Sequence, residues 1–108
     1  MGKFLTGIDH IQITAPPGSE DEARRFYGEL LWMEEIPKPE NLRPGGCWFQ
    51  CGSQEVHIGI QQNFIPAEKA HPGFTVIALE QLRLRLQEAY YPISEELPIE
   101  GRSRFFYT

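Results

Sequence analysis

Three histidines are the residues of this 108-residue chain best suited to chemistry. Each of them, His10, His57 and His71, begins or interrupts a separate apolar, strand-like run. A polar imidazole in such a run suggests a functional role. Imidazole is the commonest protein ligand for a transition metal. If the fold gathers the three side chains, they make an open site for Zn, Fe, Ni, Co or Mn, and the sequence does not say which. The alternative is three polar residues that line a pocket without a metal.

The first of these runs, residues 8–14, alternates in polarity. Ile11 and Ile13 share one face of the expected strand, whereas His10, Gln12 and Thr14 share the other. In the run that carries His57, the valine and isoleucines likewise fall on the face opposite the imidazole. Each histidine is therefore expected on the polar face of its strand.

Further polar and aromatic residues fall on the same strand faces as the histidines, or close to them. They could orient a substrate, or simply line a wet cavity or pack against neighbours. The candidates for substrate contact are Gln12, Trp48, Gln50 and Thr75.

The order of the expected elements in the first half is β-α-β-β-β. Ser19 and Glu22 have the spacing of a capping box, and apolar residues then recur at helical spacing. The pattern predicts strands at 8–14, 33–36, 47–51 and 55–61, a helix at 20–31, a loop at 38–46 and a hairpin turn at 52–54.

The second half repeats this order in a shorter form. A polar linker at 62–70 is followed by an expected strand at 71–78, a helix at 80–90, and strands at 93–97 and 102–107. Leu82, Leu86, Ala89 and Tyr90 are expected on one side of this second helix. We interpret the chain as an internal duplication in a single domain, with a first module at 1–61 and a second, truncated module at 71–108.

Composition limits the classes of function. The net charge of −5 argues against a nucleic-acid surface, which is normally basic. No apolar segment approaches the ~20 residues needed to cross a bilayer. Cys47 and Cys51 would lie about 13 Å apart in one strand, too far for a disulfide. Two free thiols favour a reducing compartment, and the cytoplasm is the expected location.

The ordered set of motifs resembles the vicinal oxygen chelate superfamily, which includes glyoxalase I, fosfomycin- and bleomycin-resistance proteins and extradiol dioxygenases. The resemblance covers essentially the whole chain. It rests on Gly7-Ile8-Asp9-His10-Ile11, Ala23-x-x-Phe26-Tyr27, Leu30-Leu31, Trp48-Phe49-x-Cys51-Gly52, Val56-His57-Ile58, His71-x-x-Phe74-x-Val76 and Arg104-Phe105-Phe106.

The resemblance implies an α+β fold in which paired βαβββ modules form a curled, mixed-sheet cup. It implies that His10, His57 and His71 occupy ligand positions on the inner strands. The family continues into an eighth strand, which usually supplies a glutamate ligand, so the chain is expected to be truncated or to have the gap filled by another chain. Trp32 and Tyr90 follow helices where relatives carry glycine, and would cost roughly 1 kcal/mol each in the left-handed cap conformation.

The first hypothesis is a glyoxalase-like, metal-dependent enzyme that acts on a small molecule with adjacent oxygens, as an isomerase, a dioxygenase or a resistance-type transferase. The expected partners are a small-molecule ligand and a second copy in a homodimer, with no nucleic acid and no membrane. The alternative is a metal-free binding protein of the bleomycin-resistance type, or an engineered or truncated scaffold without activity.

Overall fold

The structure is a computed structural model, and it describes residues 4–94 and 103–107. The chain divides into two compact units, residues 1–72 and residues 73–108, which are described separately. The fold is α+β, with a mixed four-stranded sheet in the first unit and a two-stranded sheet in the second.

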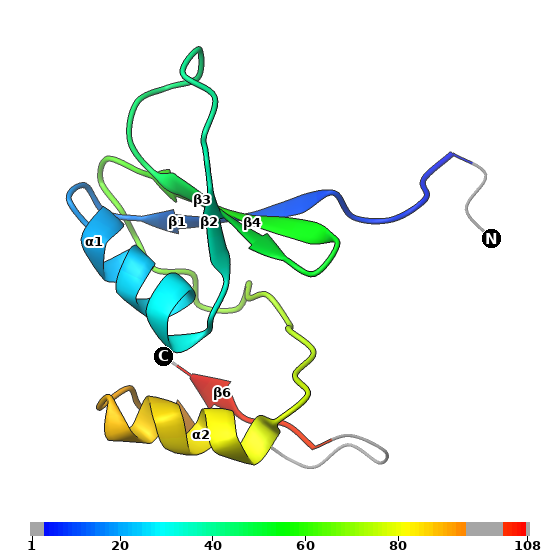
Figure 1. The fold of residues 1–108 in the computed structure, drawn as a ribbon. Coiled ribbons are helices and arrows are strands. Elements are labelled where there is room, and N and C mark those ends of the chain that lie inside the picture. Colours follow the sequence, from blue (N-terminus) through cyan, green and yellow to red (C-terminus); the bar gives the residue numbers. More distant parts are fainter. Residues whose placement is uncertain (1–3, 95–102, 108) are drawn as a thin grey trace. The chain divides into compact units, whose positions relative to one another are not determined.

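The first unit is built on strands β1 (His10–Ala15), β2 (Glu34–Ile36), β3 (Cys47–Cys51) and β4 (Gln54–Ile60), in the spatial order β1-β4-β3-β2 (Figure 1). β1 runs parallel to β4, whereas β3 is antiparallel to both of its neighbours. All four strands expected from the sequence are present, within one or two residues at their ends. Gly52 turns the β3–β4 hairpin with a positive φ of 59°, a conformation that suits glycine.

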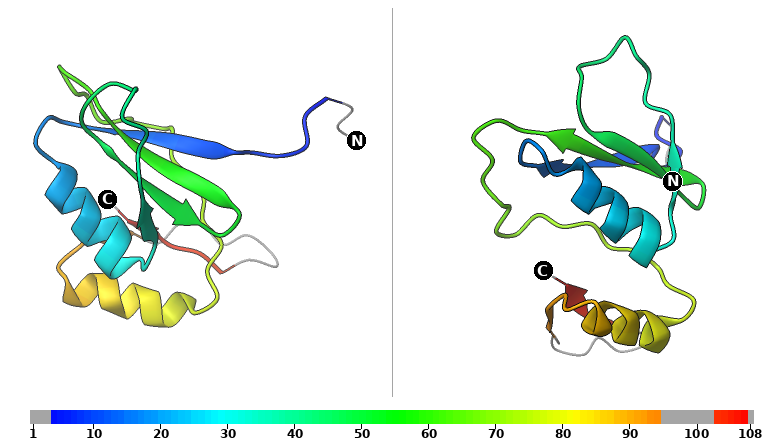
Figure 2. Two further views of the ribbon diagram at one scale, coloured as in Figure 1. Left: turned by 45° about the horizontal axis from the view of Figure 1, so that its top comes forward. Right: turned by 60° about the vertical axis from the view of Figure 1, so that its left-hand side comes forward.

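One helical segment covers one face of this sheet (Figure 2). It begins as α1 (Glu20–Ala23) and continues as the π-helical η1 (Arg24–Leu30), so the expected helix at 20–31 is confirmed, but most of it is wound as a π-helix. Its last turn shows this winding, since the Leu31 N–H donates to the Phe26 carbonyl oxygen five residues earlier, at 3.0 Å. The buried core lies between helix and sheet and comprises Ala23, Phe26, Leu30, Cys47, Phe49, Val56 and Ile58.

The expected capping box at the start of this helix is wrong. The Ser19 side chain makes no capping hydrogen bond. Its hydroxyl instead donates to the Pro16 carbonyl oxygen at 2.5 Å, because the preceding proline turn brings that acceptor within reach.

Glycine is required where the loop before β3 meets the sheet. Gly46 has a φ of +84°, and a Cβ at this position would collide with the carbonyl oxygen of Ile58. The Gly46 N–H donates to the Glu20 carboxylate at 3.0 Å, which ties the loop to the start of α1.

The second unit contains helix α2 (Leu79–Glu88) and the antiparallel strands β5 (Ile93–Ser94) and β6 (Phe106–Tyr107). Leu86 is buried, and Leu82 and Ala89 are half-buried, as expected for one side of the helix. Tyr90 was expected on the same side, but it is 93% exposed, so this part of the prediction is wrong. Part of the expected strands at 93–97 and 102–107 lies outside the described residues.

The strand expected at 71–78 is not formed. A strand exists only where a neighbour supplies the hydrogen-bond ladder, and no described strand pairs with this segment. Val76 is accordingly 40% exposed, although the alternating pattern placed it with Phe74 and Ala78 on the apolar face of the expected strand.

Candidate functional site

Three aromatic side chains stack side by side on the sheet face that the helix leaves uncovered. Trp48 and His57 are directly opposite on β3 and β4, and their ring centroids lie 3.6 Å apart with planes inclined by 3°. His10 on β1 continues the stack, with its centroid 4.2 Å from that of His57 and an interplanar angle of 17°. His57 is the middle ring and is only 5% exposed. The structure therefore brings two of the three predicted histidines together.

A carboxylate orients each of these two imidazoles. His57 Nε2 donates to Glu55 Oε1 at 2.8 Å, and His10 Nδ1 donates to Asp9 Oδ2 at 2.9 Å. With these protons in place, the lone pairs are on His57 Nδ1 and His10 Nε2. Imidazoles that bind a metal or act as a base are commonly backed by a carboxylate in this way.

Imidazole nitrogens are suitable ligands for a divalent transition metal. In this structure, however, the lone pairs of His10 and His57 do not point to a common position. A bound ion lies in the plane of its imidazole, about 2.0–2.1 Å from the nitrogen. Two nearly parallel rings 4.2 Å apart do not direct their lone pairs to one such point. Among residues 4–94 and 103–107, no group of three histidine, cysteine or acidic side chains is arranged to hold a metal ion.

The third predicted ligand, His71, lies beyond the sheet at the end of the first unit. Its ring is exposed, and Nδ1 donates to the Lys69 carbonyl oxygen at 2.7 Å. Thr75, a predicted substrate contact, is an exposed residue of the second unit. Participation of both residues in a common site stays a prediction.

Two glutamines from the prediction have distinct surroundings. The Gln12 side chain lies over Gly59, where an added Cβ would approach its amide carbon to 2.9 Å. The absence of a side chain at position 59 thus makes room for the Gln12 amide beside the ring stack. The Gln50 amide is engaged in the hairpin turn, where Nε2 donates to the carbonyl oxygens of Gly52 and Gln54.

Two functional candidates were not singled out from the sequence, namely Glu55 and Asp9. Glu55 lies two residues before His57, so the two-residue period of a strand places both side chains on one face. Glu55 is also in register with His10 across the β1–β4 ladder. The two-residue spacing between Glu55 and His57 could therefore have identified Glu55 from the sequence. The Asp9–His10 contact depends on side-chain rotamers and could not have been predicted from the sequence pattern.

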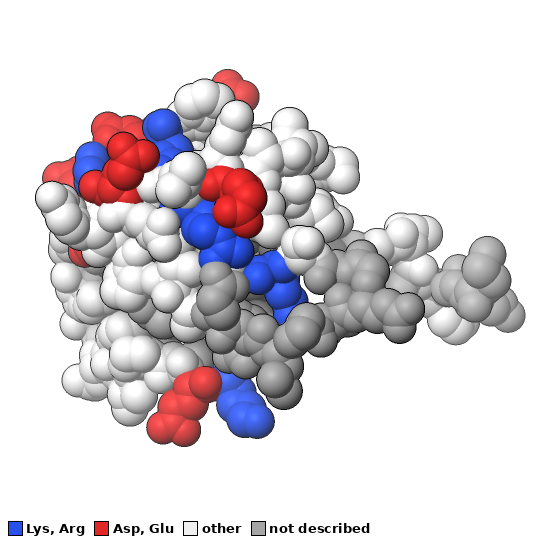
Figure 3. Space-filling view, turned by 90° about the horizontal axis from the view of Figure 1, so that it is seen from below, with Lys and Arg blue, Asp and Glu red and all other residues white. Residues whose placement is uncertain are grey.

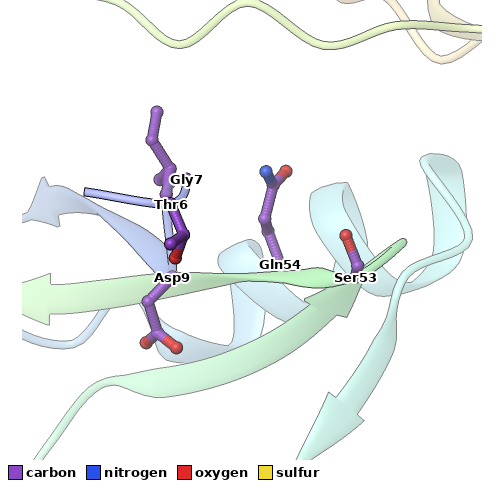
Figure 4. Close-up of a pocket in the computed structure, with 6 residues that line it drawn as sticks. Thr6, Gly7, Asp9, Ser53 and Gln54 are labelled. Carbon is purple, nitrogen blue, oxygen red and sulfur yellow. The ribbon is translucent and has the colours of Figure 1, made fainter. Parts of the chain in front are cut away.

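A polar hollow lies where the segment before β1 meets the β3–β4 hairpin (Figure 4). It has a volume of about 370 Å³ and is lined by residues 6–9 and by Ser53 and Gln54 of the hairpin. Asp9 and Gln54 immediately precede His10 and Glu55 along their strands. Figure 4 shows the Asp9 carboxylate and the Gln54 amide pointing to opposite sides of the sheet.

Several charged groups of the first unit outside the candidate site form ion pairs. Figure 3 shows acidic and basic side chains beside one another on one face. Arg24 and Glu35 form an ion pair at 3.1 Å. Burial raises the pKa of the Cys47 thiol, which keeps it protonated and unreactive. None of the described helices has the length and apolar character needed to cross a membrane.

Comparison with solved structures identifies the family. A glyoxalase family protein from Bacillus anthracis is 46% identical, with a TM-score of 0.87 over 100% of this chain and 89% of that one. The chain belongs to the glyoxalase family, within the vicinal oxygen chelate superfamily. No protein-family model and no curated protein matches the chain.

More distant glyoxalase-fold structures agree on the fold. The fosfomycin resistance protein FosX from Listeria monocytogenes, in complex with Mn(II) and 1S,2S-dihydroxypropylphosphonic acid, has a TM-score of 0.76 and 15% identity over 97% of this chain and 85% of that one. Lactoylglutathione lyase from Agrobacterium tumefaciens has a TM-score of 0.61 and 17% identity over 90% of this chain and 80% of that one.

Proposed function

We propose that this glyoxalase-family chain is a metal-dependent enzyme that acts on a small molecule with two adjacent oxygens. The observation that carries the proposal is the pair His10 and His57, which lie side by side on the open sheet face, each backed by a carboxylate. The Mn(II) complex of a relative with a dihydroxy phosphonate supports the same chemistry in the same fold.

In this proposal the His10 and His57 rings would turn out of their parallel stack so that His10 Nε2 and His57 Nδ1 could hold one ion, and His71 is the predicted third ligand. The bound metal would act as a Lewis acid towards the substrate oxygens. Asp9 and Glu55 keep the two imidazoles in the tautomers that ligation requires.

The remaining contacts follow from the geometry of the open face. Gln12 is exposed and beside the stack, so its amide is placed to donate to a substrate oxygen. Trp48 closes the other side of His57 and excludes water from that ring. The Gln50 amide already donates to two carbonyl oxygens of the β3–β4 hairpin, so Gln50 would support the site by holding this hairpin and not by binding substrate directly.

A second candidate function is metal-free binding of a small molecule on the same face. The near-parallel planes of His10 and His57 favour it, because a stack of flat rings needs no rearrangement to contact a ligand. In this case the histidines and Trp48 contact the ligand directly, and no reaction follows.

Calorimetric titration with Mn(II), Zn(II), Ni(II) and Co(II) separates the two candidates. We expect binding of one ion per chain, weakened at least about tenfold by His57→Ala and by His10→Ala, whereas Thr14→Ala, a control at an exposed position on the same face of β1, keeps its affinity. If no metal binds but the wild-type chain binds dihydroxy phosphonates, the binding-protein proposal replaces the enzyme.

We also propose that the chain works as a cytoplasmic homodimer. Both cysteines are free thiols, which supports a reducing compartment. The homodimer rests on the resemblance to a family whose members pair modules within or between chains.

A further inference from the structure

The two imidazoles of the ring stack are held to different degrees. His57 has a ring on each side, since its centroid lies 3.6 Å from that of Trp48 and 4.2 Å from that of His10. His10, at the end of the stack, has His57 as its one stacked neighbour among the residues that the structure describes. All three residues belong to the first unit. His57 is therefore confined from both sides, and His10 is confined by this stack from one.

The hydrogen bonds of the two rings differ in the same direction. His57 Nε2 donates to the carboxylate of Glu55, which lies within β4, between strands β1 and β3. His10 Nδ1 donates to the carboxylate of Asp9, which is the adjacent residue and comes just before the first residue of β1. The Asp9 carboxylate can therefore move with the His10 ring, whereas Glu55 ties His57 to the centre of the sheet.

Binding of one ion by both imidazoles requires at least one ring to turn. An ion lies in the plane of each imidazole that binds it, about 2.0–2.1 Å from the nitrogen. The planes of His10 and His57 are inclined by 17°, so they meet only far from the stack, well beyond this distance. Turning either ring makes the two planes meet along a line close to both rings, and the ion must lie on that line.

We propose that His10 is the ring that turns, that His57 is the fixed ligand, and that Trp48 is the positioning residue that holds His57 in place. The torsion about the Cβ–Cγ bond of histidine is broad, so the turn of His10 has little intrinsic cost. The same rotation of His57 would drive its ring edge into a stacked neighbour on either side. The inference rests on the proposed function for the bound ion, but the unequal freedom of the two rings is a property of the metal-free chain.

NMR relaxation dispersion of the histidine ring carbons tests this asymmetry in the full chain after removal of metal by a chelator. The method reports exchange on the microsecond-to-millisecond timescale and detects minor states of a few per cent. We expect exchange at the His10 ring and none at the His57 ring. Measurement at two pH values separates ring motion from proton exchange. Equal behaviour of the two rings, including no exchange at either, overturns the proposal.

Substitutions of Trp48 test its positioning role. Trp48→Leu removes the flat ring, so exchange should appear at His57, and Zn(II) binding should weaken by roughly two- to tenfold because the freed imidazole must then be immobilised on binding. Trp48→Phe keeps a flat ring and should restore both properties. Trp32→Leu is the matched control, because it makes the same change at a tryptophan outside the stack. An unchanged His57 in Trp48→Leu, or equal effects of the leucine and phenylalanine variants or of the control, overturns the proposal.

The outcomes for the inference and for the proposed function are distinguishable. If the wild-type chain binds no metal, the proposed function fails, and the comparison of the two rings in the metal-free chain still decides the inference. If one ion binds through both imidazoles and His57 exchanges as freely as His10, the proposed function stands and the inference is overturned. The wild-type comparison also decides the inference if Trp48→Leu does not fold, which circular dichroism would reveal.

Discussion

The residues that follow the two helices provide a stability prediction with a defined origin. Trp32 and Tyr90 have φ values of 62° and 65°, in the left-handed region, and their side chains are 78% and 93% exposed. This conformation costs a non-glycine residue about 1–2 kcal/mol. Glycine removes that cost. It also increases the conformational entropy of the unfolded chain, which lowers the free energy of unfolding by about 0.4–1 kcal/mol. We therefore expect Trp32→Gly to raise the free energy of unfolding by about 0.5–1 kcal/mol.

The matched control is Trp32→Ala, which removes the indole ring but keeps a Cβ in the left-handed conformation. Urea unfolding followed by circular dichroism gives the free energy of each variant. The glycine variant should be more stable than the alanine variant by about 1 kcal/mol, because only the backbone cost differs between them. Equal stabilities would show that Trp32 is not held left-handed and would refute the reasoning. Tyr90→Gly and Tyr90→Ala repeat the comparison in the second unit.

Three further predictions concern the first unit. Gly46→Ala should destabilise the fold by about 1–3 kcal/mol more than Gly18→Ala, measured by urea unfolding, because both have a φ near +83° but only Gly46 faces a carbonyl oxygen; equal losses would contradict the packing. The hydrogen bond from the Gly46 N–H lowers the pKa of Glu20, so this carboxylate stabilises the fold above its ordinary pKa of about 4.3 and ceases to do so as pH falls through its lowered value. Glu20→Gln should therefore be less stable than wild type at pH 7 and equal to it near pH 2, and a difference independent of pH would argue against the ionic contribution. In the native protein, a thiol reagent should modify Cys51 and spare Cys47, whereas both should react in denaturant; rapid native reaction of Cys47 would contradict its burial.

The first sheet was predictable because its determinants are local. Alternation along residues 8–14 reflects a strand with one covered face, and Gly52 and Ser53 mark a tight turn. The helical period of the apolar residues from 23 to 31 identified the helix that covers the sheet. Its π-helical winding could not be read from this period, because the buried residues Ala23, Phe26 and Leu30 are those that an α-helical period also buries.

The second unit shows where local pattern is insufficient. Residues 71–78 alternate in the same way as β1, yet form no strand, because alternation does not show whether a partner strand is available. For the candidate site, the shared face of His10 and His57 could be predicted from the period of a strand. Their stacking with Trp48 depends on strand order, and the carboxylates that back them depend on rotamers, neither of which has a sequence signature.

In the proposed function, His10 and His57 act together through His10 Nε2 and His57 Nδ1. Nitrogen NMR of the imidazole rings during a Zn(II) titration tests it most directly, because each ring nitrogen reports its own protonation and ligation. We expect these two nitrogens to respond together by one equivalent of metal, while His57 Nε2 and His10 Nδ1 keep their protons. Unchanged spectra of both rings at saturating Zn(II), or a response from His71 alone, would contradict it.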